Sequence, residues 1–245
     1  MLDGRASTAE KLTMTIQPPR RQPIFNAPIV IIVCLLLMLV VHGYKTYILS
    51  GREFVEFILY YAFIPARYTN IDLQTFSPWA GYWTPLSYSL LHADWVHLLV
   101  NSFWLLAFGS VVARRLGVPA FVLFSAIGSI GGAFAHYAFH VGEMVPMIGA
   151  SGIVSACMGG ACRFAFPSGR SFSPNNAQMP IQTIPETLAN RQAMTFIAFW
   201  FLINYVAGSG IVNLEADGSQ IAWQAHAGGF IVGFFLIPFL GQTDA

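Results

Sequence analysis

The chain has 245 residues, of which 56% are hydrophobic and only 9% are charged, a composition too apolar for a water-facing surface and typical of a membrane protein. Its 12 lysines and arginines against 11 acidic residues give a net charge of +1, which provides no basic field to bind nucleic acid. The three cysteines lie in apolar stretches without the spacing of a disulfide framework or a thiolate metal site, and we predict neither a cofactor nor a metal.

Six apolar stretches have close to the roughly 20 residues that a helix needs to cross the hydrocarbon core of a bilayer. In chain order they span residues 28–49, 87–112, 118–140, 148–166, 194–213 and 221–240. A shorter apolar stretch, Phe54–Ile64, contains Glu56 and suits an interfacial helix, so we place it in the first loop, residues 50–86. The sequence therefore predicts an all-α polytopic membrane protein with a bundle of six transmembrane helices.

Polar segments complete the predicted organisation. Residues 1–27 and 241–245 are tails on either side of a membrane domain at 28–240, and residues 167–193, rich in Ser, Pro, Asn and Gln, are expected to form a flexible loop. Nine lysines and arginines fall in the first tail and in the loops after the second and fourth spans, against three on the other side. The positive-inside bias therefore predicts that both termini lie in the cytoplasm.

Ser151 has an unusual position in the fourth predicted span. The preceding loop contains Gly142, Pro146 and Gly149, which do not suit continuous helix, so we expect the helix to begin at the serine. Only 12 residues, or about 18 Å of helix, separate Ser151 from Arg163 at the inner boundary. We therefore expect Ser151 on the order of 10 Å below the outer surface, after a re-entrant loop beside an aqueous pocket. The alternative is that the small residues around it only pack helices together.

A histidine near the start of the sixth span is expected to face this serine. His226, Gly229 and Gly233 lie on one stripe of the sixth helix, and the fourth span carries small residues at four-residue spacing, among them Gly152. Two such faces can pack closely, which would bring the His226 imidazole near the Ser151 hydroxyl. A histidine that only forms a hydrogen bond between helices is the alternative interpretation.

Two donors in the second span complete a possible reaction centre. His97 and Asn101 share a helix face at i, i+4 spacing, at the same outer depth as Ser151 and His226. Fixed donors in a low-dielectric setting are what an oxyanion hole requires. A polar cluster that joins three helices would have the same pattern, and the sequence leaves both interpretations open.

Other polar residues in the spans carry weaker signals. His136 and His140 share a face of the third span, but no third ligand completes a metal site. Asn204 in the fifth span and Gln224 in the sixth are expected to form interhelical hydrogen bonds.

Three motifs occur in order along the chain. They are His-x4-His-x3-Asn at His92, His97 and Asn101, Gly-x-Ser-Gly at 149–152, and Ala-His-x-x-Gly-x-x-x-Gly at 225–233. In this order, on six predicted spans of matching parity, they resemble the rhomboid family of intramembrane serine proteases. The resemblance covers about residues 28–240.

The resemblance implies a rhomboid-type bundle with a short fourth helix, in which Ser151 is the nucleophile and His226 is the general base. It implies that His97, Asn101 and the Ser151 amide donate to the oxyanion. Structural support is implied for His92, Gly149, Gly152, Gly229 and Gly233.

The resemblance also implies the reaction and its setting. The substrates would be membrane proteins with a transmembrane segment, cleaved in or near that segment within the lipid bilayer, and we expect a bacterial cytoplasmic membrane. Two positions depart from the family pattern, because Thr84 follows Trp83 where an arginine is usual, and Ser155 stands where a tyrosine is usual. The alternatives are a proteolytically inactive rhomboid-like protein that binds membrane clients, and a transporter with a broken helix, for which no internal repeat is visible.

Overall fold

The computed structural model describes residues 27–167, 172–209 and 222–240. The predicted polar tails therefore lie outside the described residues, apart from Ala27. The described part is helical, and its strand-like pairing is limited to one isolated bridge between Phe63 and Met147.

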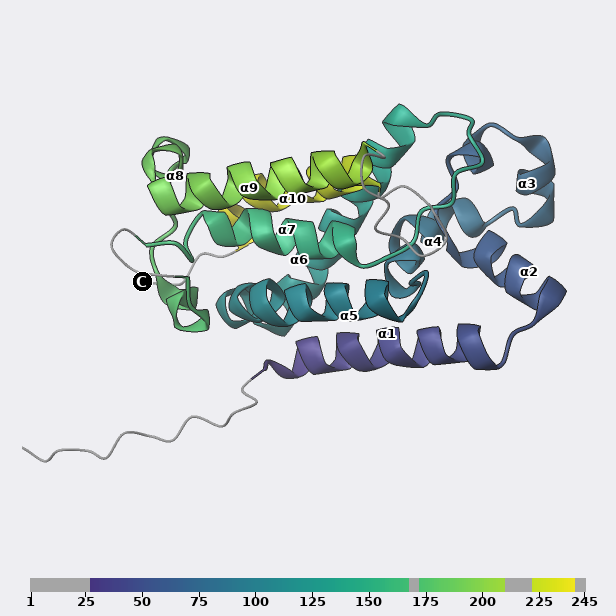
Figure 1. Ribbon diagram of the computed structural model, residues 1–245, viewed down its shortest axis with the longest axis horizontal. Helices are drawn as coiled ribbons and strands as arrows, with labels where there is room; N and C mark the ends of the chain where they lie inside the picture. The colour runs from purple at the N-terminus through teal and green to yellow at the C-terminus, as the bar shows by residue number, and fades with distance from the viewer. Residues whose placement is uncertain (1–26, 168–171, 210–221, 241–245) are drawn as a thin grey trace, which may run out of the picture.

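The longer helices form a bundle, in which α1, α5, α7 and α9 run roughly along the same direction and α6 crosses obliquely (Figure 1). They are α1 (Ile29–Tyr47), α5 (Trp95–Trp104), α6 (Ser110–Phe139), α7 (Ser151–Cys162), α9 (Arg191–Gly208) and α10 (Trp223–Leu240). Within the described ranges, three segments are long and apolar enough to cross a membrane, namely Ile29–Tyr47, Trp95–Phe139 and Trp223–Leu240. The helical membrane bundle expected from the sequence is confirmed, and the number of crossing helices stays a prediction.

The segment Trp95–Phe139 is two arms rather than one rod. A π-helical turn at Leu105–Gly109 leads from α5 into α6, and α6 breaks at Gly117, whose φ of 71° is left-handed. Pro119 follows and cannot donate a backbone hydrogen bond to the preceding turn. The break falls between the expected second and third spans.

The expected start of the second span at residue 87 is wrong. A 3-10 turn at Tyr88–Leu90 is followed by non-helical backbone, and α5 begins only at Trp95. Asp94 sets this start, because its carboxylate accepts a hydrogen bond of 2.8 Å from the backbone N–H of His97. His92 therefore lies in a loop and not on the helix that carries His97.

The first loop forms a small helical layer at one end of the bundle (Figure 1). It contains α2 (Gly51–Tyr61), a 3-10 turn (Pro65–Tyr68), α3 (Ile71–Phe76) and α4 (Ala80–Ser87). The expected short helix at Phe54–Ile64 begins three residues earlier, since Ser50 and Glu53 form a capping box that fixes its start.

The central helix of the bundle is α7, with ten of its twelve residues buried. Glycines bring α10 directly against it, because a Cβ atom on Gly229 would overlap the carbonyl oxygen of Gly152 and one on Gly233 would lie 2.6 Å from the carbonyl carbon of Ala156. The packing of two small-residue faces predicted from the sequence is thus observed. We call this contact the α7–α10 seam.

The loop between α7 and α9 differs from the expected flexible segment. Its described part contains a 3-10 turn (Pro174–Gln178) and α8 (Ile184–Ala189). The Arg115 guanidinium donates to the carbonyls of Ala177 and Met179 at 3.0 and 2.7 Å. Arg163 Nε similarly donates to the carbonyl of Gln182 at 2.9 Å. Two arginines therefore hold the loop against the bundle, a contact that polar composition alone does not indicate.

Candidate active site

Ser151 is the first residue of α7, as the sequence predicts. The first hydrogen bond inside this helix runs from Val154 N to Ala150 O, so the Ser151 amide has no acceptor within the helix. Ser151 is half-buried. A helix N-terminus of this kind presents backbone N–H groups to developing negative charge.

The loop that precedes Ser151 is fastened to the first loop. Phe63 and Met147 exchange two backbone hydrogen bonds, of 3.1 and 2.8 Å, and Ala66 N donates to Glu143 O at 3.0 Å. These bonds satisfy backbone groups in an irregular segment, which the re-entrant loop expected from the sequence would require.

A second set of bonds fixes the two residues next to the serine. Gly149 N donates to the carbonyl of Tyr88 at 3.0 Å, and Ala150 N donates to Nε2 of His92 at 3.4 Å. The buried Lys45 ammonium of α1 donates to the His92 carbonyl at 2.5 Å. His92 thus links α1 to the loop before Ser151.

Two side-chain donors converge on the backbone before the serine. Gly149 has a φ of +117°, and a Cβ atom there would lie 2.7 Å from His97 Nε2 and 3.8 Å from Asn101 Nδ2. Glycine is needed at this position for both its backbone conformation and the close approach of the imidazole. Asn101 Nδ2 also donates to the His97 carbonyl at 3.1 Å, which orients the carboxamide. The structure brings His97 and Asn101 together beside the Ser151 turn.

The α7–α10 seam sets the height of His226 relative to Ser151. Gly152, the neighbour of Ser151, lies against Gly229, and His226 is one helical turn before Gly229 on α10. Both residues are therefore at the same end of the seam, and both are half-buried. Among the described hydrogen bonds none joins the Ser151 hydroxyl to the His226 imidazole. Such bonds are commonly long in the absence of substrate.

The His226 imidazole is held from the other side by α9. Its Nδ1 is hydrogen bonded to Oδ1 of Asn204. The interhelical hydrogen bond expected for Asn204 is confirmed. The sequence did not identify His226 as its partner, because the two residues are 22 positions apart.

His136 and His140 contact the loop before the serine. Their rings are 4.6 Å apart, and His136 Nε2 is 3.4 Å from the carbonyl of Val145. His140 pairs with Glu143 at 2.8 Å. In the described part of the chain, no group of three or more His, Cys, Asp or Glu side chains is arranged to hold a metal ion.

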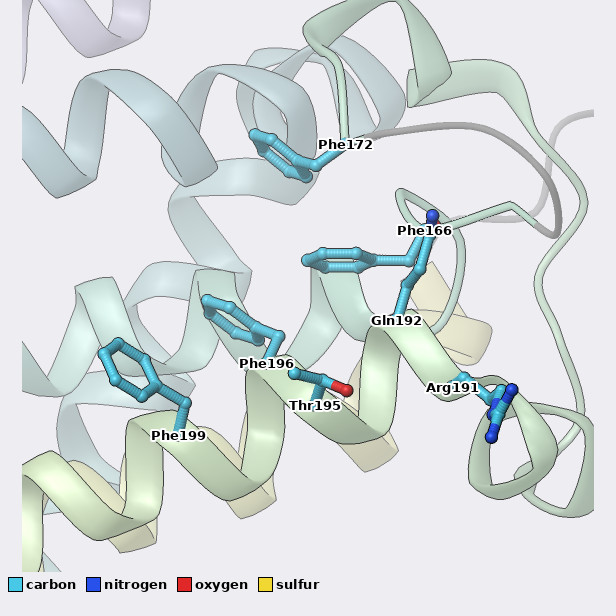
Figure 2. Close-up of a pocket in the computed structure, with 7 residues that line it drawn as sticks. All are labelled: Phe166, Phe172, Arg191, Gln192, Thr195, Phe196 and Phe199. Atoms are coloured by element: carbon cyan, nitrogen blue, oxygen red, sulfur yellow. The ribbon is translucent and has the colours of Figure 1, made fainter.

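A separate open pocket, whose lining does not include Ser151, lies at the N-terminal end of α9 (Figure 2). Its volume is about 470 Å³. It is lined by Phe166, Phe172, Arg191, Gln192, Thr195, Phe196 and Phe199. These side chains offer no nucleophile paired with a base, so this pocket is not the candidate active site.

Comparison with known proteins gives two matches. Residues 80–243 match the family model described as the Rhomboid domain. A curated relative, the rhomboid protease GluP of Bacillus subtilis (strain 168), is 29% identical over 164 residues, or 67% of this chain. The aligned part is 27% of that relative, so the chain spans about a quarter of its length.

Proposed function

The chain belongs to the rhomboid family, and from that premise we propose that it cleaves peptide bonds with a catalytic dyad of Ser151 and His226. The observation that supports the dyad is the contact between Gly152 and Gly229, because these glycines are neighbours of Ser151 and His226 on their helices. The family acts on membrane proteins within the bilayer, and the apolar helices of this chain make it an integral membrane protein.

In the proposed reaction the Ser151 oxygen attacks the carbonyl carbon of the scissile bond while His226 Nε2 accepts the hydroxyl proton. Nε2 is the available nitrogen, because Nδ1 is engaged by Asn204. The same proton then goes to the leaving amine, and water hydrolyses the acyl-enzyme by the reverse sequence of transfers.

Three donors are proposed for the oxyanion of the tetrahedral intermediate. They are His97 Nε2, Asn101 Nδ2 and the backbone N–H of Ser151, and the first two approach the backbone at Gly149. Asn101 uses one amide proton on the His97 carbonyl and retains the other for the substrate. Removal of one donor from such a hole costs roughly 100- to 1000-fold in rate.

The proposed substrates are membrane proteins with a transmembrane segment, cleaved in or near that segment. A water-filled cavity open to the outer face would supply the water for hydrolysis. The proposed location is a bacterial cytoplasmic membrane. The excess of lysine and arginine on one side supports an orientation with both termini in the cytoplasm. No observation favours the proteolytically inactive alternative, since both members of the dyad are present.

The direct test uses a fluorophosphonate, which forms a covalent bond with an activated serine. Purified full-length protein in proteoliposomes should be labelled, and should cleave at least one of a panel of single-span reporter proteins. Ser151→Ala and His226→Ala should abolish both activities, whereas Ser102→Ala, a half-buried serine on α5, is the matched control and should keep them. Labelling that persists in Ser151→Ala would refute the proposal.

A further inference from the structure

The hydrogen bond between Asn204 and His226 has a defined direction. Asn204 Nδ2 donates to the carbonyl of Trp200 at 2.7 Å, one turn earlier on α9. This bond points the NH2 group away from the imidazole and leaves Oδ1 as the atom that faces His226 Nδ1. A carboxamide oxygen only accepts hydrogen bonds, so the imidazole proton must reside on Nδ1.

The surrounding contacts keep this pair in register. On one side of it Trp200 stacks on Phe230, with ring centroids 4.8 Å apart and planes at 29°. On the other side Gly208 lies against Trp223, where an added Cβ atom would be 2.8 Å from the indole Cγ. Trp200, Asn204 and Gly208 follow i, i+4, i+8 spacing on α9. Their partners on α10 are Phe230, His226 and Trp223, so the two helices run antiparallel. The polar pair is therefore the middle contact of an otherwise apolar α9–α10 interface.

We propose that Asn204 is a positioning residue of the catalytic centre. It holds the neutral His226 ring with its proton on Nδ1 and presents the lone pair of Nε2 to Ser151. When Ser151 transfers its proton to Nε2, Nδ1 keeps its own proton and the Asn204 oxygen stabilises the resulting imidazolium. This inference rests on the proposed function. It adds Asn204, a neutral side chain, to the dyad as a third member.

Other groups around the imidazole do not replace this role. His97 on α5 lies against Gly149 and is assigned above to the oxyanion. The Nδ1 atom of His226 is engaged by Oδ1 of Asn204. A neutral amide also avoids placing a carboxylate in an apolar interface, where an ionised group is costly.

The test has two readouts, one of which does not depend on catalysis. The first is the 15N spectrum of protein labelled on histidine, in which the His226 signals are identified by their loss in His226→Ala. Wild type should show the Nδ1–H tautomer, and Asn204→Ala should lose that preference. Asn204→Leu is a second variant without an acceptor and serves if Asn204→Ala does not fold.

The second readout is the kinetics of reporter cleavage in proteoliposomes. Asn204→Ala should lower kcat by about 10-fold with little change in KM, because the substrate does not contact this side chain. Asn204→Gln keeps a neutral carboxamide oxygen as the acceptor and should restore part of the loss. Thr195→Ala removes a polar group elsewhere on α9 and is the control for helix integrity.

The outcomes separate the two proposals. If the folded variants without an acceptor keep the wild-type tautomer and kcat, the role of Asn204 is overturned. Ser151-dependent cleavage by wild type would still support the proposed protease function. If wild type shows no Ser151-dependent cleavage, the proposed function fails, and the tautomer spectrum alone decides whether Asn204 positions the ring.

Discussion

A single methyl group at Gly229 should separate the dyad without touching either of its members. In Gly229→Ala the new Cβ atom would overlap the carbonyl oxygen of Gly152 and would lie 3.0 Å from its carbonyl carbon and 3.2 Å from its Cα. All three are backbone atoms of α7, which cannot rotate away as the end of a side chain would. The helices must therefore move apart at the level of Ser151 and His226.

The size of the effect follows from this geometry. Ordinary contacts between non-bonded heavy atoms begin at about 3.5 Å, so relief of the overlap with the oxygen requires a separation of roughly 1 Å. Overpacking of this kind costs about 1 to 3 kcal/mol of stability, which an otherwise intact bundle tolerates. A displacement of about 1 Å between reacting groups can cost on the order of 100-fold in rate. We expect Gly229→Ala to fold and to cleave about 100-fold more slowly.

The assay is the initial rate of reporter cleavage, measured beside thermal unfolding in detergent. The matched control is Gly43→Ala on α1, where an added Cβ atom meets nothing within 4 Å. This control should keep wild-type cleavage and a wild-type or slightly higher unfolding midpoint. A Gly229→Ala protein that cleaves as fast as wild type would show that the seam does not set the distance between serine and histidine.

Three further changes test contacts around the site and in the loop between α7 and α9. Gly149→Ala adds a Cβ atom 2.7 Å from His97 Nε2 at a φ of +117°, so fluorophosphonate labelling should slow by about 100-fold or more, and normal labelling would contradict the converging donors. Lys45→Met leaves two backbone carbonyls without their donor and should lower the free energy of unfolding by about 1 to 3 kcal/mol, seen as a lower midpoint in a thermal scan. Arg115→Ala should expose residues 172–190 to added proteinase K, and undiminished protection would show that the guanidinium does not hold this loop.

The parts of the fold that the sequence predicted are those determined by local backbone chemistry. Gly149 and the glycine and proline before it cannot continue a helix, so the start of α7 at Ser151 was predictable. The stripe of Gly229 and Gly233 indicated a close helix contact, and the structure places it against α7. A spacing of this kind can be recognised in the sequence, because the residues that form it lie within one or two helical turns.

Contacts between distant segments were not predictable in this way. Nothing local to Lys45 indicates that it binds the His92 carbonyl, and Phe63 carries no sign of its pairing with Met147. The late start of α5 has a local signal, since Asp94 is a favoured N-cap residue. The apolar content of residues 87–93 nevertheless predicted a second span that begins too early.

The bonds around His92 and Met147 bear on how far the protein can be shortened. The motifs that mark the family begin at His92, yet two earlier residues support the loop before Ser151. Lys45 of α1 bonds the His92 carbonyl, and the His92 ring accepts from Ala150. Phe63 of the first loop pairs with Met147. A gene trimmed to the motif-bearing helices would still encode every proposed reacting group, but its product would lack the partners that fix the turn before Ser151. A minimal enzyme for inhibitor screening should therefore keep α1 and the helical layer that follows it.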